Sequence, residues 1–262
     1  MPVCPYARGG VGRRGVVTIT AIEGIPEVSP GDNLALLIAA SLRRQEIELE
    51  DDDVLVVTQK AVSKAEGRFV DLETVEPSPL AIELATTWEK DARHVEVVLR
   101  ESKRIVRMDH GVIICETRHG FVCANAGVDA SNVPGGALML LPLDPDASAQ
   151  RIREGLQRET GIDIPVIISD TFGRPWRTGS TEVAIGVAGM LPVLDYVGQV
   201  DTHGRELRAT WICIADELAS AAELVTGKLN RVPAALIRGY AVPRGEGSAQ
   251  EMVRQAERDM FR

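Results

Sequence analysis

Residues 165–189 read PVIISDTFGRPWRTGSTEVAIGVAG, and this stretch carries both the strand pattern of the chain and its most informative carboxylate. PVIISD is typical of a buried strand that ends at Asp170, because a short apolar run bounded by turn residues favours a strand. TEVAIGVAG continues the pattern of short apolar runs with small residues. A helix is predicted shortly before the stretch, from Pro145 or Asp146 through Thr160.

Outward from this stretch, short apolar runs are mixed with helical segments in both directions. Helices are expected at 34–45, where Asp32 or Asn33 can cap the N-terminus, and at 78–91. A strand followed by a long alanine-rich helix is expected at 208–228. Strands are expected at 15–22, 54–58, 94–102, 137–142 and 232–240, and within the turn-broken stretch 104–133. Because strands and helices do not alternate one for one, the pattern predicts an α+β fold rather than a doubly wound sheet.

The composition is that of a globular protein. The chain has 262 residues, 45% hydrophobic and 26% charged, which is enough for one large domain or two smaller ones. A net charge of -9 argues against nucleic acid as the main partner, although a divalent metal could still bridge acidic side chains to a small phosphorylated ligand. No run approaches the ~20 apolar residues of a membrane span, and no signal peptide is recognisable. A cytoplasmic protein with a flexible N-terminal extension over residues 1–14 is expected.

Two aspartates follow predicted strands. Asp129 stands just past a strand and a glycine turn in FVCANAGVDASNV, and Asp170 is followed by Thr171. Mg²⁺ and Mn²⁺ bind through one or two carboxylates plus substrate phosphates, so these oxygen donors suit a metal–phosphate site. Alternatively, each aspartate is an ordinary turn former. Their joint occurrence in unusual Gly- and Asn-rich contexts favours the metal site.

Basic side chains are also placed to meet phosphate or carboxylate groups. QKAVSKAEGR brings Lys60 and Lys64 directly after a predicted strand, where they either neutralise phosphate charge or face water. No GxxxxGK[ST] motif is present, so a nucleotide would be bound by another architecture. Arg174 and Arg177 beside Asp170 either hold an anionic substrate in a bidentate manner or pair with surface acids.

Five segments together carry a resemblance to a known family. They are GIPEVSPGD, TQKAVSKAEGR, NAGVDASNV, ISDTFGRPWRTG, and ADELASAAELVTGK followed by VPAALIRG. In these motifs the chain resembles the coenzyme F-420-0:γ-glutamyl ligase family over roughly residues 17–262, nearly its whole length. The family also contains two-domain actinobacterial proteins with a nitroreductase-like second half, and this chain is similar to the stand-alone form. The resemblance implies a ligase domain over 15–262, built either as one unit or as two subdomains. It also implies mixed and antiparallel sheets with flanking helices, in an intertwined homodimer.

The resemblance also assigns roles to residues of this chain. It implies that Asp129, Asp170 and Thr171 ligate Mg²⁺ or Mn²⁺, with K⁺ as a possible further ion. The implied nucleotide-binding residues are Ile25, Pro26, Glu27, Val28, Gln59, Lys64, Asn132, Thr226, Gly227, Lys228, Leu229, Asn230, Arg231, Val232 and Pro233. Where archaeal members carry a Gln that helps with a second metal, this chain has Lys228, which leaves that ligand in question.

The expected reaction is the GTP-dependent addition of L-glutamate to the F-420 precursor through an acyl phosphate, with release of GDP and phosphate. Asp129, Asp170 and Lys64 are the expected catalytic residues, with Lys64 offsetting charge on the transferred phosphoryl group. The alternatives are a deazaflavin- or nucleotide-binding module without ligase activity and a metal-dependent phosphohydrolase. The number of glutamates added and the acceptor variant are left open.

Overall fold

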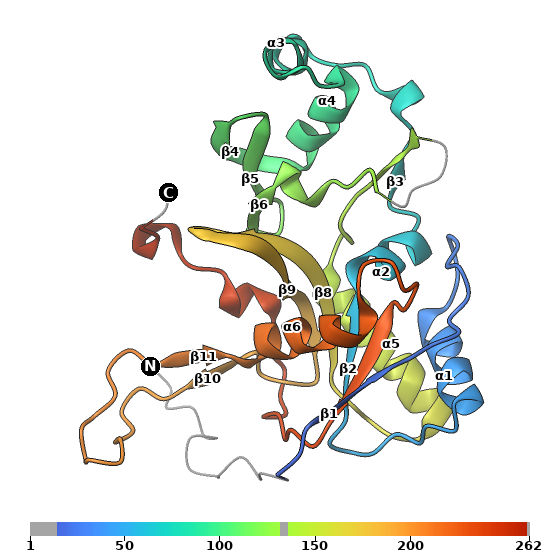
Figure 1. Ribbon diagram of the computed structural model, residues 1–262, viewed down its shortest axis with the longest axis vertical. Coiled ribbons are helices and arrows are strands. Elements are labelled where there is room, and N and C mark those ends of the chain that lie inside the picture. Colours follow the sequence, from blue (N-terminus) through green and yellow to red (C-terminus); the bar gives the residue numbers. More distant parts are fainter. Residues whose placement is uncertain (1–14, 132–135, 261–262) are drawn as a thin grey trace.

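A five-stranded sheet forms the centre of the molecule, in the order β1 (Thr18–Ala21), β12 (Ala234–Arg238), β2 (Val54–Thr58), β8 (Val166–Arg174) and β9 (Arg177–Ala188). The computed structural model describes residues 15–131 and 136–260, so the predicted extension over 1–14 and Asn132 lie outside the described residues. Only the β2–β8 pair in this sheet is parallel, and the other three pairs are antiparallel. The predicted α+β fold with mixed and antiparallel sheets is confirmed (Figure 1).

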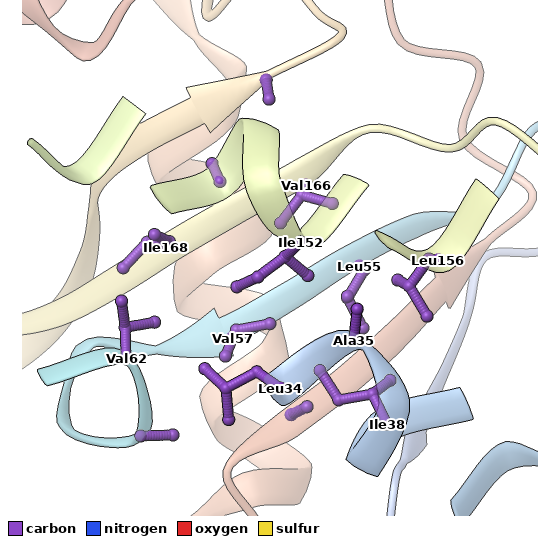
Figure 2. Close-up of a cluster of buried hydrophobic side chains, with 14 of the residues drawn as sticks. Leu34, Ala35, Ile38, Leu55, Val57, Val62, Ile152, Leu156, Val166 and Ile168 are labelled. Carbon is purple, nitrogen blue, oxygen red and sulfur yellow. The ribbon is translucent and has the colours of Figure 1, made fainter. Parts of the chain in front are cut away.

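Helices cover both faces of this sheet. One face packs against α1 (Leu34–Arg44), α2 (Gln59–Ala65) and α5 (Pro145–Thr160), and the other against α6 (Ile214–Thr226). Along β2 the buried side chains alternate, with Leu55 and Val57 facing the first group of helices and Val54 and Val56 facing α6. Figure 2 shows Leu55 and Val57 among side chains of α1, α5 and β8. Because β2 is buried on both faces, its sequence VLVVT is a continuous apolar run and does not alternate with polar residues.

The close approach of α1 and α5 depends on a glycine. A Cβ added to Gly155 would lie 2.4 Å from the Cβ of Ala35 on α1. Two helices whose contact residues are this small can pack with their backbones close together. The predicted helix over 145–160 is confirmed, and Asp144 caps its N-terminus by accepting from the Ala147 amide at 3.0 Å. For α1 the cap is Asn33.

A second group of elements lies beside the central sheet, at the top of Figure 1. It contains α3 (Pro79–Trp88), α4 (Ala92–Glu101), β4 (Ser102–Asp109), β5 (Val112–Thr117) and β6 (Val122–Ala124). The three strands form an antiparallel sheet, and the group has its own hydrophobic cluster. The expected strand at 94–102 is wrong, because almost all of that segment is helix α4. Asp91 caps this helix, and Val95, Val98 and Leu99 follow the i, i+3, i+4 spacing of one apolar helix face.

The prediction that the strand of Asp170 ends at this residue is wrong. β8 does not end at Asp170 but continues to Arg174, because β9 pairs with it along its whole length. In this register Asp170 lies opposite Val183, and Thr171 lies opposite Glu182. The aspartate is therefore held within a long hairpin rather than on a loop.

The remaining elements are short. β3 (Phe69–Val70) pairs with β7 (Leu138–Met139), and β10 (Val193–Asp195) pairs with β11 (Trp211–Cys213). The 3-10 helices are Leu72–Thr74, Asn125–Gly127, Ala249–Met252 and Ala256–Arg258. Within the described ranges, no helix combines the length and the apolar character needed to cross a bilayer.

Candidate active site

The candidate site is built around the point where β2 ends and α2 begins. Gln59 is buried there and donates to Ser63 Oγ at 2.6 Å and to the Leu140 carbonyl at 3.2 Å. The next residue, Lys60, extends its ammonium to Asp129 Oδ2 and to Ser131 Oγ, both at 2.6 Å. The first turn of α2 therefore connects the central sheet to the segment that carries Asp129.

Asp129 is positioned by a tight turn. Gly127 has φ +72°, and a Cβ on it would lie 2.8 Å from the buried side chain of Leu141, so only glycine fits without displacement. The backbone of Asp129 then exchanges two hydrogen bonds with Met139. Burial acts to raise the pKa of the Asp129 carboxyl, but hydrogen bonds from Lys60 and Ser131 hold that pKa below its ordinary value. Asp129 is therefore a fixed, ionised carboxylate.

Asp170 has the opposite electrostatic character. Burial raises the pKa of its carboxyl to about 7. The Thr171 amide and the charge of Lys228 oppose this shift, whereas the charges of Glu182 and Asp129 add to it. Like charges that raise a pKa in this way mark a place where a cation would be favourable.

A third carboxylate, that of Glu182, stands on the neighbouring strand. Its side chain accepts a hydrogen bond from Thr171 Oγ1, and the ammonium of Lys228 lies 3.6 Å from its Oε1. Lys228 also donates to Thr171 Oγ1. Ser220 on α6 donates to the Glu182 carbonyl at 2.7 Å, which fixes this part of β9 against the helix. Thr171, Glu182 and Lys228 thus form one connected polar group.

Two further segments predicted to bind a nucleotide border α2 and β2. Lys64 forms an ion pair with Glu27, which attaches the GIPE segment to α2, and Ile25 and Val28 anchor that segment in the core. The segment after α6 is anchored at both ends, by the buried Thr226 and by a 2.8 Å hydrogen bond from the Thr58 amide to the Pro233 carbonyl. Pro26 and positions 228–231 are exposed to solvent.

The structure brings together most of the predicted site, with some exceptions. Arg174 and Arg177 lie opposite each other at the tip of the β8–β9 hairpin and are exposed. Arg174 donates to the backbone carbonyls of Thr178 and Gly179 in the hairpin. The sequence singles out Lys60 as a candidate phosphate neighbour but does not predict its contact with Asp129, and it does not single out Ser131 or Glu182. Glu182 had a signal in the sequence, since it is the one charged residue of TEVAIGVAG.

The donor set fits a hard divalent cation that is completed by phosphates. No three His, Cys, Asp or Glu side chains in the described residues converge closely enough to enclose a metal by themselves. Mg²⁺ and Mn²⁺ do not need such a cage, since one or two carboxylates plus substrate oxygens satisfy them. Burial is the main cause of the raised pKa of Asp170, and the charges of Glu182 and Asp129 add to it, so a bound cation would stabilise the ionised carboxylate.

A separate pocket does not contain these groups. It has a volume of about 380 Å³ and lies between α1, α2 and α5, lined by Val62, Glu66, Arg151 and Ile152 among others. Neither Asp129 nor Asp170 lines it. We therefore place the reaction at the carboxylates, where charged groups converge, and not in this pocket.

Comparison with known proteins connects this arrangement to a family. A family model described as F420-0:Gamma-glutamyl ligase matches residues 24–239. The coenzyme F420:L-glutamate ligase of Methanothermobacter thermautotrophicus is 47% identical over 249 residues, covering 94% of this chain and 99% of the relative. That of Methanopyrus kandleri is 48% identical over 249 residues, covering 92% and 97%. That of Methanocaldococcus jannaschii is 45% identical over 231 residues, covering 88% and 90%.

Proposed function

The chain belongs to the F420-0:gamma-glutamyl ligase family, and from that premise we propose that it joins L-glutamate to coenzyme F420-0 through an amide bond, using GTP. The observation that carries the proposal is that Asp129 and Asp170 lie close together, beside the segments 25–28, 59–64 and 226–233 that border the end of β2. Carboxylates next to lysines, with the raised pKa of Asp170, match a site for a metal-bound phosphoryl group.

The chemical problem is that a carboxylate is a poor acyl donor until one of its oxygens becomes part of a good leaving group. The terminal carboxylate of the acceptor attacks the γ-phosphorus of GTP, GDP leaves, and an acyl phosphate forms. The amine of glutamate then attacks the acyl carbon, phosphate leaves with that oxygen, and the amine loses a proton. In-line phosphoryl transfer needs positioning and charge stabilisation more than covalent help from the protein.

Each residue has a defined task in this scheme. Asp129 and Asp170 would hold Mg²⁺ or Mn²⁺, with Thr171 as a further candidate, and the bound ion would neutralise phosphate charge. Lys64 lies in the last turn of α2, with its side chain largely buried. Released from Glu27, its ammonium can offset charge on the transferred phosphoryl group. K⁺ is proposed as a further ion of the site.

The nucleotide is proposed to lie against the segments 25–28, 59–64 and 226–233. The exposed residues of the last segment are available to cover it, since both ends of that segment are anchored. Arg174 and Arg177 are proposed to hold an anionic substrate, and their exposure at the hairpin tip is compatible with that role.

A homodimer is part of the same proposal. The β8–β9 hairpin extends beyond the helices that cover the sheet, and the side chain of Trp176 at its tip is 83% exposed (Figure 1). An exposed tryptophan on a projecting hairpin is a surface that a second copy of the chain can cover. Size-exclusion chromatography with light scattering would test this point.

The proposed function is tested by incubating the protein with GTP, Mn²⁺, L-glutamate and F420-0. Mass spectrometry is expected to find the acceptor heavier by a glutamyl unit, with equal amounts of GDP and phosphate released. GTP loss without glutamate consumption would instead identify a phosphohydrolase. Binding of acceptor or nucleotide without any turnover would identify a binding module.

A further inference from the structure

The Thr171–Glu182–Lys228 group contains a buried carboxylate with its own cation. Glu182 is only 6% exposed, and a carboxylate removed from water requires a compensating positive charge and hydrogen bonds. Thr171 Oγ1 supplies a hydrogen bond to it, and the Lys228 ammonium supplies the charge at 3.6 Å. The donated bond from Lys228 to Thr171 Oγ1 links all three side chains.

The backbone around Lys228 is constrained. Gly227 has φ +56°, and a Cβ on it would lie 2.6 Å from the side-chain nitrogen of Asn230, so this turn requires glycine. Beyond it the segment is anchored by the hydrogen bond from Thr58 to Pro233. On the other side, Thr171 and Glu182 are direct cross-strand partners, which places their side chains on one face of the hairpin. The ammonium therefore meets a preformed pair of oxygen groups.

The charged groups of the site are divided unequally between two positions, the Asp129–Asp170 pair and the Thr171–Glu182 pair. Asp129 and Asp170 carry two carboxylates, and among the described residues the one cation in contact with either is Lys60, at Asp129. Within the described ranges, no cationic side chain forms an ion pair with Asp170, although the charge of Lys228 acts on it from a longer distance and lowers its pKa. Glu182, by contrast, has one carboxylate and one ammonium. With all groups ionised, the Asp129–Asp170 pair keeps a net negative charge that attracts a divalent ion. The Thr171–Glu182 pair is already neutralised by Lys228.

We infer that the Lys228 ammonium is a built-in cation on the Thr171–Glu182 pair, so that this active site takes one divalent ion, at Asp129 and Asp170, and excludes a second. This deepens the proposed function of the same site and rests on it. Unlike a bound ion, the Lys228 ammonium cannot be removed by a chelator. The inference concerns ion number, a property that can be measured without turnover.

The test counts bound Mn²⁺ per chain. Free Mn²⁺ is measured by electron paramagnetic resonance during a titration of the full chain, with and without a non-hydrolysable GTP analogue, and binding to the analogue alone is subtracted. The wild type is expected to bind one ion per chain. Lys228→Gln, which removes the ammonium and offers an oxygen, is expected to bind two.

Two matched variants separate charge from structure. Lys228→Arg keeps the positive charge and is expected to bind one ion. Glu182→Gln added to Lys228→Gln removes the carboxylate that has lost its ammonium partner, and is expected to return the count to one. The Lys228 side chain is 58% exposed, so its single variants should fold, and thermal unfolding checks this.

Two results would overturn the inference: two ions per wild-type chain, or one ion per Lys228→Gln chain. The glutamyl-addition assay distinguishes this failure from failure of the proposed function. A protein with the expected ion counts but no glutamyl transfer refutes the ligase assignment. A ligase with unexpected counts refutes only the role of Lys228.

Discussion

Replacing Gly127 by alanine should damage both the fold and the metal site, because this glycine forms the turn before Asp129. An alanine forced into a left-handed backbone conformation costs about 1 kcal/mol. The new Cβ would also lie 2.8 Å from Leu141, a side chain that is 2% exposed and cannot move into solvent. Overpacking of this kind adds about 1–3 kcal/mol, so we expect a total loss of ~2–4 kcal/mol in the free energy of unfolding.

Gly161→Ala is the matched control. Gly161 has φ +79° at the end of α5, and a Cβ there would meet no atom within 4 Å. Gly161→Ala should therefore lose only about 1 kcal/mol in the free energy of unfolding, measured for both variants by urea denaturation. In Mn²⁺ titrations of the folded proteins, Gly127→Ala should bind the ion more weakly than wild type, and Gly161→Ala should not. Equal stability losses, or unchanged Mn²⁺ affinity in Gly127→Ala, would refute the role assigned to this turn.

Three further predictions follow from charged groups. Arg238→Met leaves the fully buried Asp53 without its bidentate partner and should lower the free energy of unfolding by about 3–5 kcal/mol in urea denaturation. Arg153 and then Arg244 hold the pKa of Asp163 below its ordinary 3.8. The ionised carboxylate therefore stabilises the fold above pH 3.8, and this stabilisation is lost as the pH falls further. In Asp163→Asn the free energy of unfolding should depend less steeply on pH in this acidic range. Chelation of divalent ions with EDTA should stop glutamyl addition and added Mn²⁺ should restore it, whereas turnover persisting in EDTA would contradict a metal-dependent reaction.

The sequence predicts the central sheet and most helices well, because their apolar periods are clear. VLVVT has the continuous apolar run of a strand covered on both faces, and the helix over 145–160 has a capping aspartate at one end and glycine at the other. Residues 94–102 were mistaken for a strand because valines and glutamate alternate in HVEVV. The helix instead buries Val95, Val97 and Val98 in one cluster, with Leu99 partly buried against it, and tertiary packing decides this outcome.

The candidate site could be predicted in part, and the rest depends on tertiary contacts that the local sequence does not show. Asp129 and Asp170 could be selected from local context, since each follows apolar residues near a turn. The contacts of Lys60 with Asp129 and of Glu182 with Thr171 and Lys228 could not be predicted in this way, because they join segments that are distant in the sequence. The extent of β8 was underestimated because pairing with β9 carries the strand past its apolar run. Long-range pairing of this kind leaves no local signal.

The central claim is that the site activates a carboxylate with GTP, and isotope transfer tests it most directly. F420-0 carrying heavy oxygen in its terminal carboxylate is incubated with GTP, Mn²⁺, L-glutamate and the protein, and the released phosphate is analysed by mass spectrometry. An acyl phosphate requires one carboxylate oxygen to leave with each phosphate, so we expect one heavy oxygen per phosphate for every glutamyl unit added. Unlabelled phosphate released alongside glutamyl addition would contradict the account.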